Sequence, residues 1–584
     1  MTESATLPEL LDRAASIPDT GLRLLDRHLQ AEWLPWSEIR DRAQRIAGGL
    51  QELGVCRGER VALIYPTCAG FFEALFGVLV AGAVPAPLYP PVRLGRLDEY
   101  TDRTAAMLRA VDARLVLADG RVRRLLGEAV EAAAPDLGCL ELSALPTRAS
   151  RPVRVTDLDL ALVQFSSGTT VDPKPVALSH RAVVAQTVRL NSFWPDGDGR
   201  VHSGASWLPL YHDMGLIGCV FPALERPAVL TLIPPELFVA RPAVWLQTIS
   251  RYRATVSPAP NFAYGLCAEK IRDEEMDGVD LSSWSVALNG AEPVAPKVLR
   301  KFQRRFSQWG FRPQALTPVY GLSEASLAVT FSDIHHPFST RLFDRDDLAD
   351  GHRAVESADG LEMVSLGRPL EGFKLRVVDR DRRDLPEGRV GKVLVRGPSL
   401  MDGYLGMEQA TGAVLRDGWL DTGDLGFLVD GELFLTGREK DVLILRGRNH
   451  SPVEVEHALD AVDGVRTGCS AAFSFMAEDR ETESLVVLVE ARGEVAGAGY
   501  PEIASASARA VRAATGLQPD HVEVVPPGTL PRTSSGKIRR REAMQRWRGG
   551  ALRPPQPVNL WRVGVAMVRS SLAASRSRRR REHS

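Results

Sequence analysis

Short apolar runs alternate with longer apolar helical patterns through the first third of the chain. Residues 60–65 (RVALIY) predict a buried strand, and residues 70–83 predict an apolar helix directly after it. Residues 114–118 and 161–165 are two further strand candidates. This alternation of strands and helices is typical of a doubly wound α/β domain.

After residue 367 the pattern changes to short strands between glycine and aspartate turns, at residues 374–379, 391–396, 425–429 and 432–436. They predict a β-rich subdomain that completes a large N-terminal domain over 1–439. From 440 to 548, mixed patterns predict a small, mobile α+β C-terminal domain of about 100 residues. Residues 549–584 carry prolines and an arginine cluster, and we expect them to form a flexible tail.

Composition excludes several classes of protein. The 584 residues carry 72 basic and 73 acidic side chains, so no overall field attracts nucleic acid, and the arginine tail predicts at most a weak contact with an anionic surface. No apolar run reaches the roughly 18 residues of a transmembrane segment, and the acidic N-terminus lacks the features of a signal peptide. The six scattered cysteines form no C-x-x-C pair, which favours a cytoplasmic protein over a disulfide scaffold or a zinc protein.

Lysine is scarce: only eight of the 72 basic residues are lysines, and the rest are arginines. Lysine differs from arginine in carrying a compact point charge on a flexible stem. Each lysine is therefore a candidate for a position where that chemistry is needed.

One polar loop has the composition of a phosphate-binding loop. Residues 164–174 read QFSSGTTVDPK, so that an apolar strand runs into small polar residues. Consecutive backbone N–H groups and hydroxyls in such a loop can hold a phosphate. The loop lacks the G-x-x-x-x-G-K-[ST] pattern of a Walker A motif, and on these residues alone a polar turn is an equally good interpretation. The candidate phosphate ligands are Ser166, Ser167, Gly168, Thr169 and Thr170.

Six further motifs follow this loop along the chain: WLPLYHDMGLIG (207–218), NGAEPV (289–294), YGLSEAS (320–326), WLDTGDL (419–425), TGREKD (436–441) and PRTSSGKIR (531–539). With the loop, and in the same order, they resemble the signatures of the adenylate-forming (acyl-activating) superfamily. Any single match is a weak signal, but the ordered set is specific.

The resemblance implies that a carboxylate attacks the α-phosphorus of ATP to give an acyl-adenylate and pyrophosphate. It implies that the loop and Lys174 hold the phosphates of ATP, and that Glu324 binds Mg²⁺ with Thr169 nearby, since Mg²⁺ prefers oxygen ligands. Lys537 would bridge the substrate carboxylate and the α-phosphate. Lys440 would lie at a hinge about which the small domain rotates after adenylation.

The same resemblance implies the rest of the nucleotide site. Asp424 would accept hydrogen bonds from both ribose hydroxyls, and Arg438 would also contact the ribose. The residues expected around the adenine, together with their motif neighbours, are Asn289, Gly290, Ala291, Glu292, Tyr320, Gly321 and Ser323. Taken singly, each of these residues is also compatible with a purely structural role, such as a surface lysine or a turn-capping aspartate.

Four segments resemble fatty acyl-AMP ligases, the branch that passes the acyl group to the phosphopantetheine thiol of an acyl carrier protein, or of a carrier domain in a polyketide or nonribosomal peptide synthase. They are residues 207–218, PNFAY (260–264), YPPV (89–92) and GRNHSP (447–452), and residues 333–363 occupy the place of an insertion thought to restrain domain rotation. Val171 and Pro175 replace two glycines of the usual loop, whereas the retained Lys174 points mildly to the acyl-CoA branch.

The substrate expected from these segments is an apolar acid. Trp207, Met214 and Phe262 are candidates for an acyl pocket, with His212 at its entrance, although packing in the core explains them equally well. We therefore expect a fatty acyl-AMP ligase that uses ATP and Mg²⁺. The alternatives are a long-chain acyl-CoA synthetase on the same fold and a non-catalytic regulator that binds an adenylate.

Overall fold

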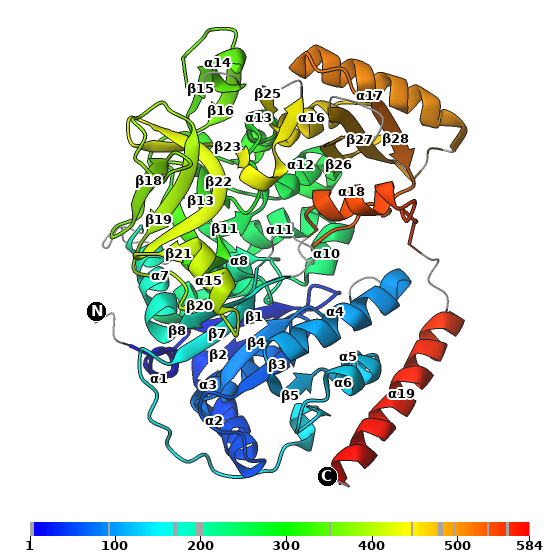
Figure 1. Cartoon of the computed structure of the whole chain (residues 1–584). Helices are drawn as coiled ribbons and strands as arrows, with labels where there is room; N and C mark the ends of the chain where they lie inside the picture. Colours follow the sequence, from blue (N-terminus) through cyan, green and yellow to red (C-terminus); the bar gives the residue numbers. More distant parts are fainter. Residues whose placement is uncertain are drawn as a thin grey trace.

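A nine-stranded sheet runs through the large domain (Figure 1). The computed structural model describes residues 5–91, 94–166, 173–193, 202–349, 352–445, 448–476, 483–493, 495, 497–533, 536–555 and 560–582. Six neighbouring strands of the sheet are parallel, and antiparallel strands close both of its edges. In spatial order the strands are β17 (Arg368–Pro369), β14 (Ala328–Phe331), β13 (Leu316–Gly321), β12 (Val286–Asn289), β11 (Val256–Ala259), β9 (Ser203–Ser206), β10 (Val229–Leu232), β1 (Gly21–Leu25) and β2 (Ala31–Pro35).

Helices pack against this sheet through large aromatic side chains. Trp245, Tyr264, Trp284 and Phe302 are fully buried and contact one another edge-on or stacked. Rings of this size contribute much of the stability of such a core. The helices of this part are α7 (His180–Ser192), α9 (Phe221–Glu225), α10 (Pro235–Ala240), α11 (Ala243–Tyr252), α12 (Asn261–Lys270) and α13 (Pro296–Phe306).

A second, four-stranded parallel sheet confirms the α/β pattern of the first third of the chain. Its strands are β4 (Val84–Leu88), β3 (Arg60–Ile64), β5 (Ala113–Ala118) and β6 (Cys139–Leu140). The predicted strands and the apolar helix occur within a few residues of their expected positions. The accompanying helices are α2 (Trp36–Glu52), α3 (Ala69–Val80), α4 (Leu97–Ala110), α5 (Gly120–Arg123) and α6 (Gly127–Ala133).

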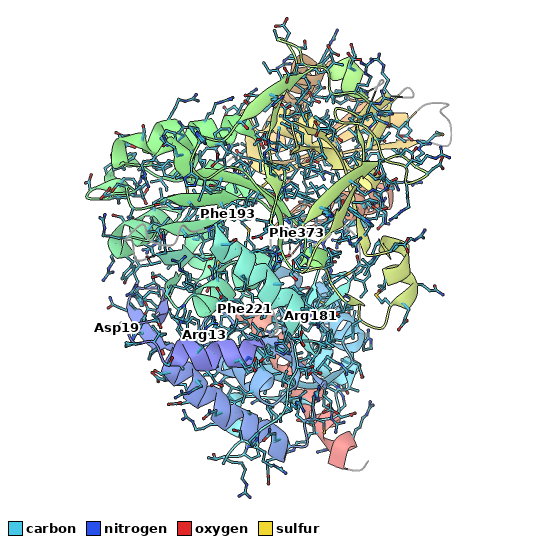
Figure 2. The ribbon with its side chains drawn as sticks, turned by 90° about the vertical axis from the view of Figure 1, so that its left-hand side faces the viewer. Arg13, Asp19, Arg181, Phe193, Phe221 and Phe373 are labelled. Carbon is cyan, nitrogen blue, oxygen red and sulfur yellow. The ribbon has the colours of Figure 1, made fainter. Side chains whose placement is uncertain are left out.

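The N-terminal helix α1 (Leu7–Ala15) joins the two parts of the large domain. Thr6 begins it with a capping box in which Glu9 takes part. Arg13 Nη2 lies 3.4 Å from Glu225 Oε1 on α9, and Figure 2 shows Arg13 on the same side of the molecule as Phe221 of α9.

The β-rich subdomain expected after residue 367 is also present. Its antiparallel sheet contains β18 (Lys374–Val378), β19 (Gly391–Arg396), β22 (Trp419–Val429), β21 (Leu415–Arg416) and β23 (Glu432–Arg438). A separate three-stranded sheet contains β7 (Leu160–Phe165), β8 (Pro175–Ser179) and β20 (Gly403–Tyr404), with α15 (Glu408–Val414) beside it.

Residues 333–363 contribute a hairpin of β15 (Thr340–Phe343) and β16 (Leu361–Val364), with α14 (Arg345–Ala349) between them. Phe343 is fully buried and contacts Phe427 and Phe434 of the β-rich subdomain edge-on. The segment is therefore attached to the large domain by a small aromatic core of its own.

The part of the chain after residue 440 begins with the hairpin β24 (Leu443–Leu445) and β25 (Arg448–His450). A three-stranded sheet and helices follow, with their own buried apolar cluster. They are β26 (Val465–Met476), β27 (Glu483–Ala491), β28 (His521–Val525), α16 (Pro452–Leu459), α17 (Tyr500–Thr515) and α18 (Arg540–Arg548).

The C-terminal segment differs from the flexible tail that the sequence predicted. Residues Leu560–Glu582 form helix α19, which lies beside α6 at the edge of the large domain (Figure 1). No helix among the described residues is both long enough and apolar enough to cross a membrane.

Candidate active site

The phosphate-loop candidate is a connection between two antiparallel strands. β7 ends just before Ser166, and β8 begins just after Lys174. The Ser166 amide donates to the Lys174 carbonyl at 2.9 Å, and the Lys174 amide donates to Ser166 Oγ at 3.2 Å. These bonds close the base of the loop. The other four phosphate candidates, Ser167, Gly168, Thr169 and Thr170, lie outside the described residues.

Lys174 and Glu324 both contact the same tyrosine, Tyr404. Lys174 Nζ is 4.4 Å from the ring centroid of Tyr404, and the Tyr404 hydroxyl donates to Glu324 Oε1 at 2.8 Å. Burial lowers the pKa of Lys174, as does the nearby charge of Lys440, while Glu324 opposes both effects. Burial raises the pKa of Glu324. A carboxylate that is partly buried and holds a single hydroxyl donor is a suitable ligand for a hard cation.

The predicted adenine residues lie at the carboxyl ends of β12 and β13, which are parallel neighbours. Asn289 is fully buried; its Nδ2 donates to Asn261 Oδ1 at 3.3 Å, and its Oδ1 has no hydrogen-bond partner among the described residues. An unused buried acceptor is costly unless a ligand satisfies it. The exocyclic amine of adenine is such a donor, so this position fits a nucleotide.

Two glycines allow close backbone approach at these strand ends. A Cβ at Gly290 would lie 2.7 Å from Val319 Cγ2, and one at Gly321 would lie 1.8 Å from the Leu327 carbonyl oxygen. Ala291 adopts a left-handed conformation with φ of 68°. Gly290, Ala291 and Gly321 therefore determine the path of the backbone at these strand ends.

The ribose candidate Asp424 is almost fully buried, with 6% of its surface exposed. Its Oδ2 accepts from the Tyr320 hydroxyl at 2.7 Å, and its Oδ1 accepts from Arg438 Nε at 3.2 Å across the β22–β23 pair. Burial raises the pKa of Asp424, while Arg438 and Tyr320 lower it. Three predicted residues from three motifs thus contact one another directly.

Lys537 reaches this cluster from the other domain. Its amide donates to Thr533 Oγ1 at 3.0 Å, and its carbonyl accepts from the Thr533 amide at 2.8 Å, which holds the loop in a tight turn. Burial lowers the pKa of the Lys537 ammonium, whereas the negative charges of Asp213, Glu292 and Asp424 raise it. A half-buried cation in the field of several carboxylates is suited to screening a reaction between two anions.

Asp213 is a site residue that the sequence reasoning used only as a branch marker. It is 5% exposed, its Oδ1 lies 2.7 Å from His212 Nδ1, and its Oδ2 accepts from the Ser323 hydroxyl. Burial raises its pKa, but His212 and Ser323 prevail and hold it well below the usual range of a carboxyl. The signals in the sequence were an aspartate directly after a histidine in WLPLYHDMGLIG and a hydroxyl residue, Ser323, in YGLSEAS.

The comparisons with known proteins agree with this geometry. The family model for AMP-binding enzymes matches residues 21–405. The chain belongs to this family.

Three similar proteins place this AMP-binding enzyme close to ligases of fatty acids. JamA of Moorena producens, named a medium-chain-fatty-acid–[acyl-carrier-protein] ligase, is 33% identical over 565 residues, which are 93% of each chain. A protein of Caulobacter vibrioides named as an acyl-CoA synthetase is 35% identical over 93% of this chain and 96% of its own. A solved structure from work on fatty acyl-adenylate ligases of E. coli and L. pneumophila has a TM-score of 0.87 and 33% identity, covering 93% of this chain and 98% of that one. The fold is therefore that of adenylate-forming enzymes.

The large and small domains of this AMP-binding enzyme contact each other through charged side chains of α4 and α18. Glu542 on α18 is 5% exposed and accepts from Arg103 Nη2 at 2.8 Å and from Arg546 Nη2 at 2.5 Å. Arg546 Nη1 also donates to Glu99 at 3.0 Å. Hydrogen bonds between charged groups that are partly shielded from water are comparatively strong. These contacts hold α18, and with it the preceding loop that carries Lys537, against the large domain.

The predicted hinge residue Lys440 lies in a single turn, Glu439–Asp441, between the domains. Its side chain is exposed, and its carbonyl accepts from Arg541 Nη2 at 3.1 Å. Arg540 pairs with Asp441 at 3.3 Å, so the turn is attached to α18. The role of this turn as a hinge stays a prediction.

The acyl-pocket candidates are divided between the core and the site. Trp207 and Met214 are 4% and 5% exposed and belong to the main core, where Trp207 stacks on Phe238 at 3.9 Å. Phe262 is partly buried beside Trp207, and its amide donates to Glu292 Oε1 at 2.5 Å. Glu292 thus orients the start of α12, which links the nucleotide motif to the apolar side of the site.

His212 faces a small cavity between the two domains. The cavity has a volume of about 30 Å³, and its walls include Ser166, Tyr211, His212 and Thr533. His212 Nε2 has no hydrogen-bond partner among the described residues, whereas Nδ1 faces Asp213. This cavity lies between Ser166, at the base of the phosphate-loop candidate, and Thr533, at the base of the loop that carries Lys537.

Proposed function

We propose that this AMP-binding enzyme is a fatty acyl-AMP ligase that uses Mg²⁺ and ATP. The observation that supports this most is the position of Lys537 of the small domain, where the negative charges of Asp213, Glu292 and Asp424 of the large domain raise the pKa of its ammonium. Bringing charged groups of two domains together out of water costs free energy, and such an arrangement is typical of a site that binds a charged ligand.

In the proposed reaction a carboxylate oxygen of the fatty acid attacks the α-phosphorus of ATP. A new O–P bond forms, the bond to the β-phosphate oxygen breaks, and pyrophosphate leaves with the electron pair. Asp424 accepts from the ribose hydroxyls and Asn289 from the adenine amine. Lys537 places its ammonium between the carboxylate and the α-phosphate, which reduces their repulsion and stabilises the charge developing at phosphorus.

Glu324, and Thr169 in the loop, are the residues proposed to hold Mg²⁺. The metal would neutralise charge on the phosphates and so favour departure of pyrophosphate. Ser166 and Lys174 would bind the same phosphates.

ATP–pyrophosphate exchange with a panel of fatty acids tests the first half of this proposal. We expect exchange that depends on an apolar acid and on Mg²⁺. If the protein binds an adenylate but catalyses no exchange with any acid of the panel, it is the non-catalytic regulator, and the proposal fails.

The proposed acceptor is the phosphopantetheine thiol of a carrier protein. The carrier-protein ligase named among the relatives supports this choice. The segment 333–363 supports it as well: Arg345 pairs with Glu454, and Arg448 Nη1 lies 3.2 Å from Asp346, so that the segment restrains the small domain. The second candidate is an acyl-CoA synthetase, favoured by the retained Lys174 and by the name of the Caulobacter relative.

Asp213→Asn should reduce the rate of exchange about 10- to 100-fold, because it removes a charge that stabilises the Lys537 ammonium. The pKa of Lys537 is already lowered, and the substitution lowers it further. The alkaline limb of the pH–rate profile should therefore move to lower pH, because the reaction needs the protonated lysine. Exchange measured across pH checks this, with exposed Asp381→Asn as the matched control. An unshifted profile would show that Asp213 is only structural.

Lys440→Pro should impair transfer more than adenylation if the small domain rotates about this turn. Proline fixes φ near −65° and so restricts a hinge that must adopt two backbone settings. We expect exchange to fall no more than about threefold and carrier acylation to fall at least about tenfold. Lys440→Ala, which removes only the side chain, is the control. Equal losses in both half-reactions would contradict the hinge assignment.

A further inference from the structure

The C-terminal helix α19 exposes large apolar side chains along one side. Trp561, Val565, Val568 and Leu572 are 73%, 38%, 61% and 56% exposed. Their spacing of i, i+4, i+7 and i+11 places them on one helix face. With Met567, five of the fourteen exposed large hydrophobic residues among those described lie on this helix. Trp561, Val565, Val568 and Leu572 form an exposed apolar stripe, and a group of exposed apolar side chains in a soluble protein indicates a contact surface.

The opposite face of α19 is the face that packs on the protein. Ser570, Ala573 and Ser577 are 3%, 0% and 7% exposed, at i, i+3 and i+7. The Gly127 amide at the start of α6 donates to Ser570 Oγ at 2.7 Å. A Cβ at Gly127 would lie 1.9 Å from the Ser570 carbonyl oxygen, so the two backbones approach as closely as glycine permits.

Two ion pairs on the flank fix the rotation of α19 about its axis. Arg569 lies 3.0 Å from Glu128, and Arg576 lies 2.7 Å from Glu131. Since the small residues and these pairs hold one face on α6, the apolar stripe of Trp561, Val565, Val568 and Leu572 is directed away from the protein. We call this stripe the outer face of α19.

The helix is also strongly basic. Residues 560–582 contain a single acidic residue, Glu582, although the whole chain has a net charge of −1. Described Arg578, Arg579 and Arg580 are exposed, and they directly follow the outer face along the helix. The basic residues of the helix are Arg562, Arg569, Arg576, Arg578, Arg579, Arg580 and Arg581.

We infer that the outer face of α19 binds to the surface of an anionic phospholipid bilayer. An apolar stripe with a tryptophan at one end and arginines at the other matches a helix that lies in the plane of the interface, with its apolar side among the acyl chains and its cations among the headgroups. The stripe from Trp561 to Leu572 spans only about 16 Å, so the helix rests on the bilayer and does not cross it.

This surface goes beyond the proposed function, since nothing in the adenylation site requires α19. If the substrate is a fatty acid, as proposed, the contact would also hold the large domain at the phase into which that substrate partitions. α19 is anchored to α6 of the large domain, and rotation of the small domain would therefore leave the contact in place.

Flotation of the full-length protein with phospholipid vesicles tests the inference. The vesicles are phosphatidylcholine alone, or phosphatidylcholine with about one-third phosphatidylglycerol. The test variant is Val568→Asp/Leu572→Asp, which places two acids on the outer face. The matched control is Val239→Asp/Leu158→Asp, the same exchange at residues that are 60% and 65% exposed elsewhere. Thermal unfolding and pyrophosphate exchange establish that both variants fold.

We expect the wild type and the control to float with anionic vesicles, more weakly with neutral vesicles and more weakly when salt rises from about 0.1 M to about 0.5 M. The outer-face variant should bind at least about tenfold more weakly. Equal binding by the two variants would overturn the inference. So would an absence of vesicle binding while the outer-face variant alone loses carrier acylation, which would make the stripe a protein-docking surface. Flotation needs no catalysis, so its outcome is independent of the proposed reaction.

Discussion

Lys537→Ala should reduce ATP–pyrophosphate exchange by at least about 10²- to 10³-fold, the loss typical when one group that stabilises developing charge is removed. In the structure the negative charges of Asp213, Glu292 and Asp424 act on the ammonium and raise its pKa. Asn289 and Asp424 are held in place by hydrogen bonds to Asn261, Tyr320 and Arg438. ATP binding should consequently change by no more than a few-fold.

Equilibrium binding of ATP and single-turnover formation of acyl-adenylate separate these two effects. Lys301→Ala is the matched control, because it removes an exposed lysine that pairs with surface Glu269 at 3.4 Å. It should behave like the wild type. An undiminished exchange rate in Lys537→Ala would refute the role assigned to this lysine, whereas a parallel loss of ATP binding would make it a nucleotide ligand only.

Glu324→Gln should have the second largest effect, a fall of about 10²-fold in exchange together with a higher Mg²⁺ requirement. Glutamine keeps the shape of the side chain and can still accept from the Tyr404 hydroxyl, which donates at 2.8 Å in the wild type. The substitution therefore removes the negative charge with little change in packing. Burial raises the pKa of Glu324, so its carboxylate becomes protonated at a higher pH than that of an exposed glutamate. We therefore expect the wild-type enzyme to lose exchange activity toward acid pH as well.

Titration of exchange activity with Mg²⁺ measures this prediction. Tyr404→Phe serves as the comparison, because it deletes the hydroxyl partner and keeps the carboxylate. We expect it to lose far less activity than Glu324→Gln. If Glu324→Gln showed the wild-type Mg²⁺ dependence, the carboxylate would not be the metal ligand.

Much of the fold was predictable because strands and helices of the large domain bury continuous apolar runs. β3 at Arg60–Ile64 and α3 at Ala69–Val80 are hydrophobic over most of their length, so their burial is evident from the residues alone. The candidate site was predictable for a different reason. Asn289, Asp424 and Lys537 occur in ordered motifs, and a resemblance across several motifs identifies a site that no single residue reveals.

The contacts between distant segments were not predictable. Asp213 is held by Ser323, 110 positions further along the chain, and no local pattern encodes that bond. Helix α19 was not predicted from the sequence for a related reason. Its arginines and small residues are typical of a solvated tail, and it packs only because Gly127 admits the backbone at Ser570. The contact with α6 therefore accounts for the helix, although the local composition is typical of a disordered segment.

Competition between two acyl acceptors tests the central claim most directly. The protein is incubated with a labelled fatty acid and Mg²⁺-ATP, and the acyl-adenylate is then offered CoA or a holo carrier protein in parallel. A fatty acyl-AMP ligase predicts label on the carrier thiol and little acyl-CoA. Rapid formation of acyl-CoA with an unlabelled carrier protein would contradict the account and make the protein an acyl-CoA synthetase.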